Sequence, residues 1–253
     1  MKSLAFVVPV HGRLQLAQIC LRQLRRTCDA LIQGGVSASA VIVSDRHTLK
    51  QLDPLELGFA IVERDNSFTS RRFNDGIQLA TDPKHNQSPA DYVVPFGSDD
   101  WADHRLFLEP LPGPDTIFGF QWMSFVSENG CEISSRHLNY EGGSGIRIIP
   151  RELVEPLGYR PADEDRLRGC DTSILVNLRR HHGDRLKVKH WHLHERQIVD
   201  WKTSGAQLNS YRAVTSLHQG NAERDPFTVL VEFYPAEALA EMEEHYLGVK
   251  VAA

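Results

Sequence analysis

Four short apolar runs in the first half of the chain alternate with stretches of helical periodicity or long connections. The runs cover residues 4–10, 40–44, 59–62 and 91–96. After the first run, apolar side chains recur at helical spacing, at Leu14, Ala17, Leu21 and Leu24. Strands that alternate with helices or long crossovers form a parallel sheet with helices on both faces. We therefore predict an α/β fold with a mostly parallel central sheet flanked by helices.

Polar residues follow each of these runs, at the point where the predicted strand ends. They are His11 and Arg13 after the first run, Asp45 after the second, Asn66 after the third, and Ser98, Asp99 and Asp100 after the fourth. Because the carboxyl ends of parallel strands lie at one edge of a sheet, these side chains are expected to converge there. Asp99 and Asp100 would repel each other, which favours a cation between them and a phosphate. The alternative is a solvated turn followed by a helix cap.

The second half contains further predicted strands and helices. We expect strands at residues 115–126, 186–195 and 227–234, and helices at residues 150–157, 171–180 and 236–246. Asp171 stands where the N-cap of its helix would lie. No segment is rich enough in Pro, Gly or Ser to mark a domain boundary, so we predict a single domain over residues 1–253.

Composition and missing motifs argue against several classes of protein. The formal net charge of −5 argues against a surface built to bind phosphate backbones, so nucleic acid is not an expected partner. No apolar run is long enough for a signal peptide or a transmembrane segment. The four cysteines form no C-x-x-C pair, which favours free thiols in a cytoplasmic protein. A dinucleotide fingerprint, a P-loop and a nucleophile elbow are all missing from the sequence.

Three motifs occur in a fixed order along the chain. Pro9-Val-His-Gly-Arg13 follows the first strand, Arg72-Phe-Asn-Asp-Gly-Ile77 lies in a helical stretch, and Asp91-Tyr-Val-Val-Pro-Phe-Gly-Ser-Asp-Asp100 ends in acids. This order, from about residue 4 to about residue 180, resembles family-two glycosyltransferases of the GT-A fold. The resemblance implies a nucleotide-sugar-binding half over about residues 1–110. An acceptor half with a C-terminal tail would follow over about residues 111–253.

The resemblance also implies a role for individual residues. Contacts with the nucleotide sugar are implied for Val10, His11, Arg13, Asp45, Arg71, Arg72, Asn74 and Ser98. Asp99, helped by Asp100, matches the acids that bind Mn²⁺ or Mg²⁺ beside the donor diphosphate, and Asp171 matches the general base. Three positions depart from the family pattern. Gly97 replaces the first acid of the Asp-x-Asp motif, Phe73 replaces an Arg, and Gly169-Cys-Asp171 keeps only one carboxylate of the usual Glu-Asp pair.

A histidine-rich segment near residue 190 offers a further metal ligand. On an extended strand, His190, His192 and His194 point to the same face. Neutral imidazole binds Mn²⁺-like ions, and GT-A enzymes often use a late histidine for this purpose. We prefer His194 as the ligand, with His192 second. The alternative is a half-exposed strand whose histidines pack against aromatic rings.

These patterns together predict a glycosyltransferase that is inverting and depends on Mn²⁺ or Mg²⁺. The expected donor is a UDP- or GDP-sugar, and the expected acceptor is a hydroxyl group on a glycan, a protein or a small molecule. Asp171 would remove the proton of that hydroxyl. Two alternatives stay open. One is a nucleotidyltransferase, and the other is a non-catalytic module that keeps the fold and binds a glycan or a protein.

Overall fold

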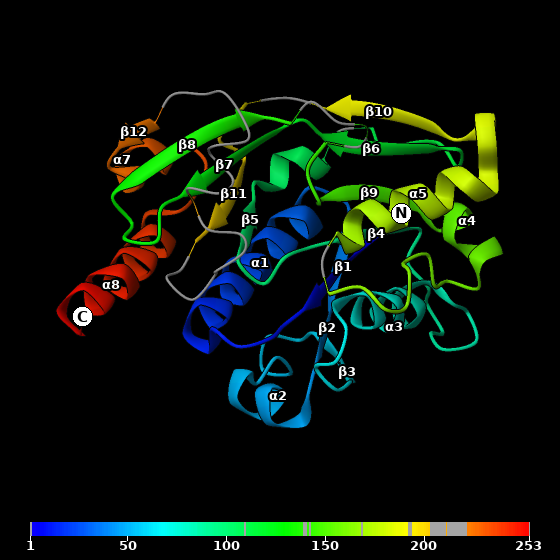
Figure 1. Cartoon of the computed structure of the whole chain (residues 1–253), viewed down its shortest axis with the longest axis horizontal. Helices are drawn as coiled ribbons and strands as arrows, with labels where there is room; N and C mark the ends of the chain where they lie inside the picture. The colour runs from blue at the N-terminus through cyan, green and yellow to red at the C-terminus, as the bar shows by residue number, and fades with distance from the viewer. Residues whose placement is uncertain are drawn as a thin grey trace.

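The chain contains two sheets with helices packed on them (Figure 1). The structure is a computed structural model that describes residues 2–108, 110–138, 141, 143–167, 169–191, 194–202, 211 and 222–252. Its larger sheet has seven strands and its smaller sheet has five. The larger sheet is mostly parallel and lies between helices, so the predicted α/β fold is confirmed.

The larger sheet contains the four strands predicted in the first half. Its order is β10 (Lys187–Trp191), β6 (Thr116–Phe120), β9 (Arg147–Pro150), β4 (Tyr92–Pro95), β1 (Ser3–Pro9), β2 (Ser37–Ser44) and β3 (Ala60–Glu63). Strand β9 runs antiparallel to both of its neighbours, and the other pairings are parallel. The parallel block of β4, β1, β2 and β3 therefore presents all its carboxyl ends at one edge.

Successive side chains of β1 point to opposite faces of the sheet and pack against different helices. Phe6 and Val8 belong to a core with the helices α1 (Leu14–Gln33), α2 (Arg46–Leu52) and η1 (His104–Phe107). Val7 belongs to a core on the other face, with α3 (Thr69–Thr81), α4 (Arg151–Val154), η2 (Glu155–Leu157) and α5 (Cys170–His182). Helix α3 approaches this face closely, because a Cβ on Gly76 would lie 2.4 Å from a methyl group of Val7. The sheet is thus covered on both faces.

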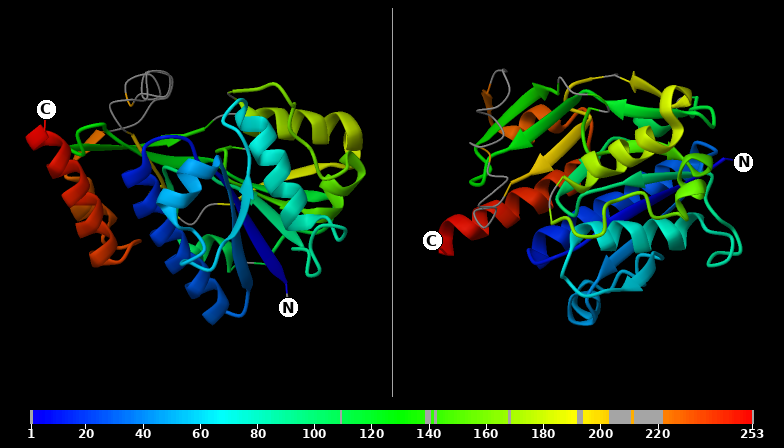
Figure 2. Two further views of the ribbon diagram at one scale, coloured as in Figure 1. Left: turned by 90° about the horizontal axis from the view of Figure 1, so that it is seen from below. Right: turned by 45° about the vertical axis from the view of Figure 1, so that its right-hand side comes forward.

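The smaller sheet extends the fold beyond α1. Its order is β12 (Ala222–Arg224), β8 (Glu132–His137), β7 (Trp122–Val126), β11 (Ile198–Trp201) and β5 (Asp100–Ala102). Apolar residues of α1 pack against it together with α7 (Pro226–Leu230) and α8 (Ala236–Ala252). Helix α8 lies beside α1, at the opposite end of the molecule from α4 and α5 (Figures 1 and 2). After β4 of the larger sheet, the chain passes through the acidic turn over residues 97–100 and enters β5 of the smaller sheet.

Three predicted elements differ from the structure. The strand predicted at residues 115–126 breaks at Gln121 into β6 and β7, which belong to different sheets. The strand predicted at residues 227–234 is wrong. These residues form α7 and a turn, because Pro226 stands in the first helical turn and Asp225 accepts a hydrogen bond from the backbone N–H of Thr228. The strand predicted at 186–195 is shorter, ends at Trp191 and follows the short helix η3 (Gly183–Arg185).

The two predicted halves of the chain exchange strands between the sheets. Strands β6, β9 and β10 come from the second half and complete the larger sheet, while β5 comes from the first half and joins the smaller sheet. The division near residue 110 stays a prediction. Within the described part of the chain, none of the helices has the length and apolar character that crossing a membrane would need.

Candidate functional site

The loops that follow β1 and β4 lie side by side at the carboxyl edge of the larger sheet. The parallel register pairs Val7 with Pro95, and the backbone N–H of Phe96 donates to the carbonyl oxygen of Val7 at 3.0 Å. On the other side of β1, the N–H of Val10 donates to the carbonyl oxygen of Val43 at 2.9 Å. These contacts carry the ladder past the strand ends. They bring the loop over residues 10–13 next to the acidic turn over residues 97–100.

Several hydrogen bonds surround Asp45, and we call the residues that make them the Asp45 network. Its members are Val10, Asp45, Thr48, Asn66 and Arg72. Asp45 caps α2 by accepting from the N–H of Thr48 at 3.0 Å and from its hydroxyl at 2.8 Å, and it also accepts from the amide of Asn66. The buried guanidinium of Arg72 donates to the carbonyl oxygen of Val10 at 2.8 Å and to Asn66 Oδ1 at 3.1 Å.

The hydrogen bonds within the Asp45 network fix the charge of its carboxylate. The N–H and hydroxyl of Thr48, with a further contribution from Asn66, lower the pKa of Asp45 to about 2. The side chain is therefore both a helix cap and an acceptor that is ionised at neutral pH, beside the loop over residues 10–13. The contacts show Asp45 as the cap of α2, and its predicted contact with a nucleotide sugar stays a prediction.

Three carboxylates meet where β4, β5 and β11 come together, and we call them the acid cluster. One oxygen each from Asp99, Asp100 and Asp200 lies within 4.8 Å of the others. The antiparallel register of β11 and β5 pairs Asp200 directly with Asp100, and the N–H of Trp201 donates to the carbonyl oxygen of Asp99 at 2.9 Å. The acids predicted from the fourth run are thus joined by a third acid from a distant part of the chain.

Two cationic side chains contact the acid cluster. Arg13 Nη1 lies 2.7 Å from Asp99 Oδ2, and Arg13 itself has left-handed backbone angles, with φ of 47°. Lys202 Nζ lies 2.5 Å from Asp200 Oδ2, and this lysine is only 2% exposed. Burying three acids together without positive charge would be costly, so these cations stabilise the cluster as it stands.

The acid cluster is nevertheless short of positive charge and of hydrogen-bond donors. Burial raises the pKa of Asp100 well above its usual range, and the charges of Asp200 and Asp99 raise it further. Burial also raises the pKa of Asp200 to about 6, although Lys202 opposes this rise. Asp200 Oδ1 is buried and has no hydrogen-bond partner among the residues that the structure describes. Clustered carboxylate oxygens with an unsatisfied acceptor are the donor set that Mg²⁺ and Mn²⁺ prefer, so these residues fit a divalent cation.

Gly97 explains why the first acid of the Asp-x-Asp motif is missing. The N–H of Gly97 donates to Asp100 Oδ2 at 2.9 Å, so the carboxylate turns back over the glycine. A Cβ on Gly97 would lie 2.4 Å from that same oxygen. No side chain fits at position 97 while Asp100 keeps this position. Asp100 therefore fills the space that an acid at position 97 would otherwise occupy.

Asp171 lies at the amino end of α5, next to the buried side chain of Arg147. Arg147 Nη2 is 3.6 Å from Asp171 Oδ2, and Arg147 Nη1 donates to the carbonyl oxygen of Asp171 at 2.5 Å. The register of β9 on β4 pairs Ile149 with Val93, which puts Arg147 level with Pro95 at the carboxyl edge. Asp171 thus belongs to the same edge as the acids. The predicted N-cap role is wrong, because Gly169 is the N-cap and Asp171 lies in the first turn.

Four more residues that are predicted to contact the nucleotide sugar lie in different environments in the structure: Asn74, Arg71, His11 and Ser98. Asn74 is fully buried and bonds both the N–H and the carbonyl oxygen of Ala162 at 2.8 Å, so it fastens α3 to the loop before α5. Arg71 pairs with Asp165 at 2.7 Å on the outside of that loop. His11 is exposed, and Ser98 is buried beside the acid cluster. The structure brings Ser98 to the acids, whereas Asn74 and Arg71 serve contacts within the protein.

The structure does not bring His194 to the acid cluster. Its ring stacks on Phe233, with ring centroids 4.7 Å apart. The register pairs Ile198 with Ala102, so His194 lies past the end of β5 that points away from Asp100. Asp200 takes the place that the prediction reserved for a late histidine. The second predicted ligand, His192, lies outside the described residues.

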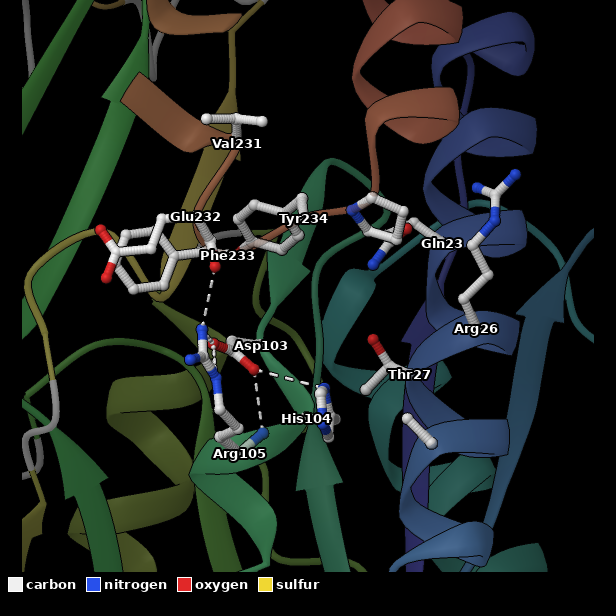
Figure 3. Close-up of a pocket in the computed structure, with 12 residues that line it drawn as sticks. Gln23, Arg26, Thr27, Asp103, His104, Arg105, Val231, Glu232, Phe233 and Tyr234 are labelled. Carbon is white, nitrogen blue, oxygen red and sulfur yellow. Dashed lines mark hydrogen bonds and ion pairs between the residues drawn. The ribbon is translucent and has the colours of Figure 1, made fainter. Parts of the chain in front are cut away.

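A pocket of about 350 Å³ lies on the far side of β5 from the acid cluster, between α1, η1 and the turn after α7 (Figure 3). Phe233 and Tyr234 line it opposite Asp103, whose carboxylate is held by Arg105 at 2.5 Å. Tyr234 packs on Trp101, and side chains alternate along a strand, so Trp101 and Asp100 point to opposite faces of β5. The pocket is therefore separate from the acids.

Sequence reasoning missed Asp200 and Lys202, although a signal was present. Both follow the apolar pair Ile198-Val199, in the order Asp-Trp-Lys. A charged residue inside a buried strand is rare without a partner or a function. Asp200 and Lys202 reach the acids only because β11 pairs with β5, and the sequence pattern does not reveal this pairing.

The fold is similar to that of solved GT-A-type glycosyltransferases. Glucosyl-3-phosphoglycerate synthase from Mycobacterium tuberculosis, solved with Mg²⁺ and UDP, matches with a TM-score of 0.52 and 12% identity, over 90% of this chain and 92% of that chain. The catalytic domain of Drosophila β1,4-galactosyltransferase 7, solved with xylobiose, matches with a TM-score of 0.48 and 15% identity, over 78% and 67%. The first of these likenesses confirms the predicted GT-A type of fold.

A synthase of another kind gives a weaker structural match. The 4-diphosphocytidyl-2C-methyl-D-erythritol synthase of Anaerococcus prevotii matches with a TM-score of 0.45 and 14% identity, over 78% of this chain and 90% of that chain. No family model matches the sequence, and no curated protein matches it either. At such identities the likeness defines the fold, and the activity has to be argued from the residues at the carboxyl edge.

Proposed function

We propose that this chain transfers a sugar from a nucleotide-sugar donor to a hydroxyl acceptor. The observation that supports this most is the acid cluster, with its unpartnered buried oxygen, at the carboxyl edge of a GT-A-type sheet. Ligands of open α/β sheets bind at that edge, outside the ends of the strands. The Asp45 network adjoins the same edge, so the nucleoside and the diphosphate of one donor have neighbouring sites.

Asp99, Asp100 and Asp200 would hold Mn²⁺ or Mg²⁺ in this proposal. When bound, such a cation neutralises the negative charge that develops on the departing nucleoside diphosphate. The acids themselves supply hard oxygen ligands, and Gly97 orients one of them by its N–H. Arg13 adds a second positive charge on the side of the loop over residues 10–13.

The nucleoside end of the donor is assigned to the Asp45 network and the loop after β1. Asp45 is ionised and accepts hydrogen bonds, so it suits a ribose hydroxyl or a base N–H. Arg72 and Asn66 hold that carboxylate in place and act as positioning residues. The similar synthase of M. tuberculosis was solved with UDP, so UDP-sugars are the first donors to test, followed by GDP-sugars.

Asp171 is the proposed general base. The oxygen of the acceptor hydroxyl attacks the anomeric carbon, the bond from that carbon to the diphosphate oxygen breaks, and Asp171 takes the hydroxyl proton. Attack from the side opposite to the leaving group inverts the anomeric configuration. Arg147 lies 3.6 Å from the carboxylate of Asp171 and donates to the backbone carbonyl oxygen of the same residue, so it keeps Asp171 oriented.

Donor binding and catalysis can be separated by one substitution. Asp171→Asn is expected to lower the rate of transfer by about 1000-fold, which is within the range for loss of a general base. Its affinity for the UDP-sugar should stay within about twofold of the wild type, because Asp171 lies outside the donor contacts. Asp115→Asn, which alters an exposed acid paired with Lys187, is the matched control and should leave both unchanged. An equal loss of affinity and transfer in Asp171→Asn would remove Asp171 from the role of base.

Thermal denaturation with nucleotides tests the wider assignment. UDP or GDP should raise the melting temperature, and Mn²⁺ should increase that rise, because ligands that bind only the folded state stabilise it. A response to nucleoside triphosphates alone would instead indicate a nucleotidyltransferase. No response to any nucleotide, with or without Mn²⁺, would indicate a binding module without catalysis.

A further inference from the structure

Lys202 is a buried cation that points into the acid cluster. It follows directly after β11, and its side chain is 2% exposed. Because side chains alternate along an extended chain, Lys202 and Asp200 lie on the same side, while Trp201 between them packs on Trp101 in the core. The order Asp-Trp-Lys thus delivers one acid and one ammonium group to the same place.

Within the described part of the chain, Lys202 is held by contacts of both its side chain and its backbone. Its ammonium group pairs with Asp200 Oδ2 and lies 5.4 Å from the ring centre of Phe125. Its backbone N–H donates to the carbonyl oxygen of Val126, and its carbonyl oxygen accepts from the hydroxyl of Tyr246 at 2.7 Å. A lysine anchored in this way cannot move far from the acids without breaking the end of β11.

A divalent cation at the acid cluster would compete with this ammonium group for the same oxygens. Asp200 has one oxygen on Lys202 and one that is unpartnered, and Arg13 already holds Asp99. Positive charges in one desolvated cluster repel each other. An anionic ligand that accepts hydrogen bonds from Lys202 would remove this competition, and a diphosphate is such a ligand.

We propose that Lys202 is the built-in counter-ion of the acid cluster, which opposes divalent-cation binding until a nucleoside diphosphate takes over its ammonium group. The inference rests on the proposed function, because it assumes that the cluster binds a cation and a diphosphate together. It makes the two ligands cooperative: each binds more tightly when the other is present. Lys202 is the origin of that coupling.

The test is a pair of titrations on the whole chain, with Mn²⁺ alone and with UDP at saturating Mn²⁺, followed by calorimetry. Lys202→Met is expected to bind Mn²⁺ alone about tenfold more tightly than the wild type, because a competing charge is gone. The same variant is expected to bind UDP about tenfold more weakly, because a charged hydrogen bond to phosphate is lost. Lys187→Met removes a lysine from an exposed pair with Asp115 and should change neither affinity.

The opposite signs of these two changes distinguish the proposal from simple structural damage, which would weaken both ligands. Unchanged or weaker Mn²⁺ binding by folded Lys202→Met would overturn the inference while leaving the proposed function intact. Failure of Mn²⁺ to bind the wild type and the variant alike would count against the metal-dependent function itself. If Lys202→Met unfolds without metal, Mn²⁺ should restore its fold by replacing the ammonium group, and failure to do so contradicts the proposal.

Discussion

The Asp45 network and the acid cluster lie at the same edge of the sheet, but the pKa values of their carboxylates shift in opposite directions. Hydrogen bonds from Thr48 and Asn66 lower the pKa of Asp45 to about 2. Burial raises the pKa of Asp200 to about 6, and one of its oxygens has no partner. The first region has its hydrogen bonds in place, and the second keeps capacity for another positive charge.

The difference indicates that the Asp45 network has a supporting role and that the acid cluster binds a ligand. In the Asp45 network, hydrogen bonds from Thr48 and Asn66 hold the carboxylate in a fixed position, so it offers a fixed surface. A cluster of crowded acids is stabilised by any cation that binds to it. We therefore interpret the Asp45 network as a rigid platform for the nucleoside and the acid cluster as the place where ligand binding changes the local charge.

The sharpest way to break the comparison is to remove an acid from the cluster. Asp200→Asn is expected to lower Mn²⁺ affinity by about 100-fold, because a charged ligand becomes neutral and Lys202 loses its partner. Calorimetric titration measures this loss. Asp115→Asn is the control, since it changes an acid that is paired but exposed. Equal affinities for the wild type and Asp200→Asn would remove Asp200 from the site.

Two neighbouring arginines test whether the Asp45 network is mainly structural. Arg72→Met should lower the free energy of unfolding by about 2 kcal/mol, because the carbonyl oxygen of Val10 and the amide of Asn66 lose a charged donor. Arg71→Met should cost less than about 1 kcal/mol, since its partner Asp165 is exposed. Chemical denaturation measures both. Equal losses would mean that the network is no more rigid than the surface.

Gly97 links the shape of the acidic turn to its charge. Gly97→Ala should lower Mn²⁺ affinity by about tenfold, because its methyl group would displace the Asp100 carboxylate from its hydrogen bond. In Gly145→Ala the new methyl group would make only ordinary contacts with Asp171, at 3.7 Å, so this variant should bind Mn²⁺ normally. A normal affinity in Gly97→Ala would show that Asp100 is not held by this turn.

The smallest expected effect is the pH dependence contributed by Asp45. Its pKa is depressed in the folded chain, from an ordinary 3.8 to about 2. This group therefore stabilises the fold above pH 3.8, and its contribution is lost as the pH falls towards 2. The contribution should be below about 1 kcal/mol, because solvent screens this carboxylate. Denaturation curves of the wild type and Asp45→Asn should converge as the pH falls from 4 to 2; a constant difference would contradict this.

The sequence predicted the half of the site that lies in the first hundred or so residues, where strands and loops alternate regularly. Asp99 and Asp45 follow apolar runs directly, so parallel pairing alone brings them to one edge. Asp200 reaches the same edge through an antiparallel pairing with β5, across half of the chain. Periodicity does not report such long-range register, so the sequence instead indicates His194, which lies near the end of the predicted histidine-rich strand.

Local chemistry explains the other differences between prediction and structure. Residues 227–234 contain the β-branched and aromatic side chains of a strand, yet Asp225 and Pro226 begin a helix there. Asn74 matches a nucleotide-binding motif, yet both ends of its amide are used by Ala162. A motif identifies the position of a residue in a fold, whereas its hydrogen-bond partners are set by tertiary packing.

The most direct test of the account is anomalous diffraction at the manganese edge from crystals soaked with Mn²⁺ and UDP. The account predicts one strong peak within about 2.5 Å of carboxylate oxygens from Asp99, Asp100 and Asp200, a distance ordinary for hard cations. Density for the diphosphate should lie between that peak and Lys202. A peak elsewhere, or an empty acid cluster in crystals that bind UDP, would contradict it.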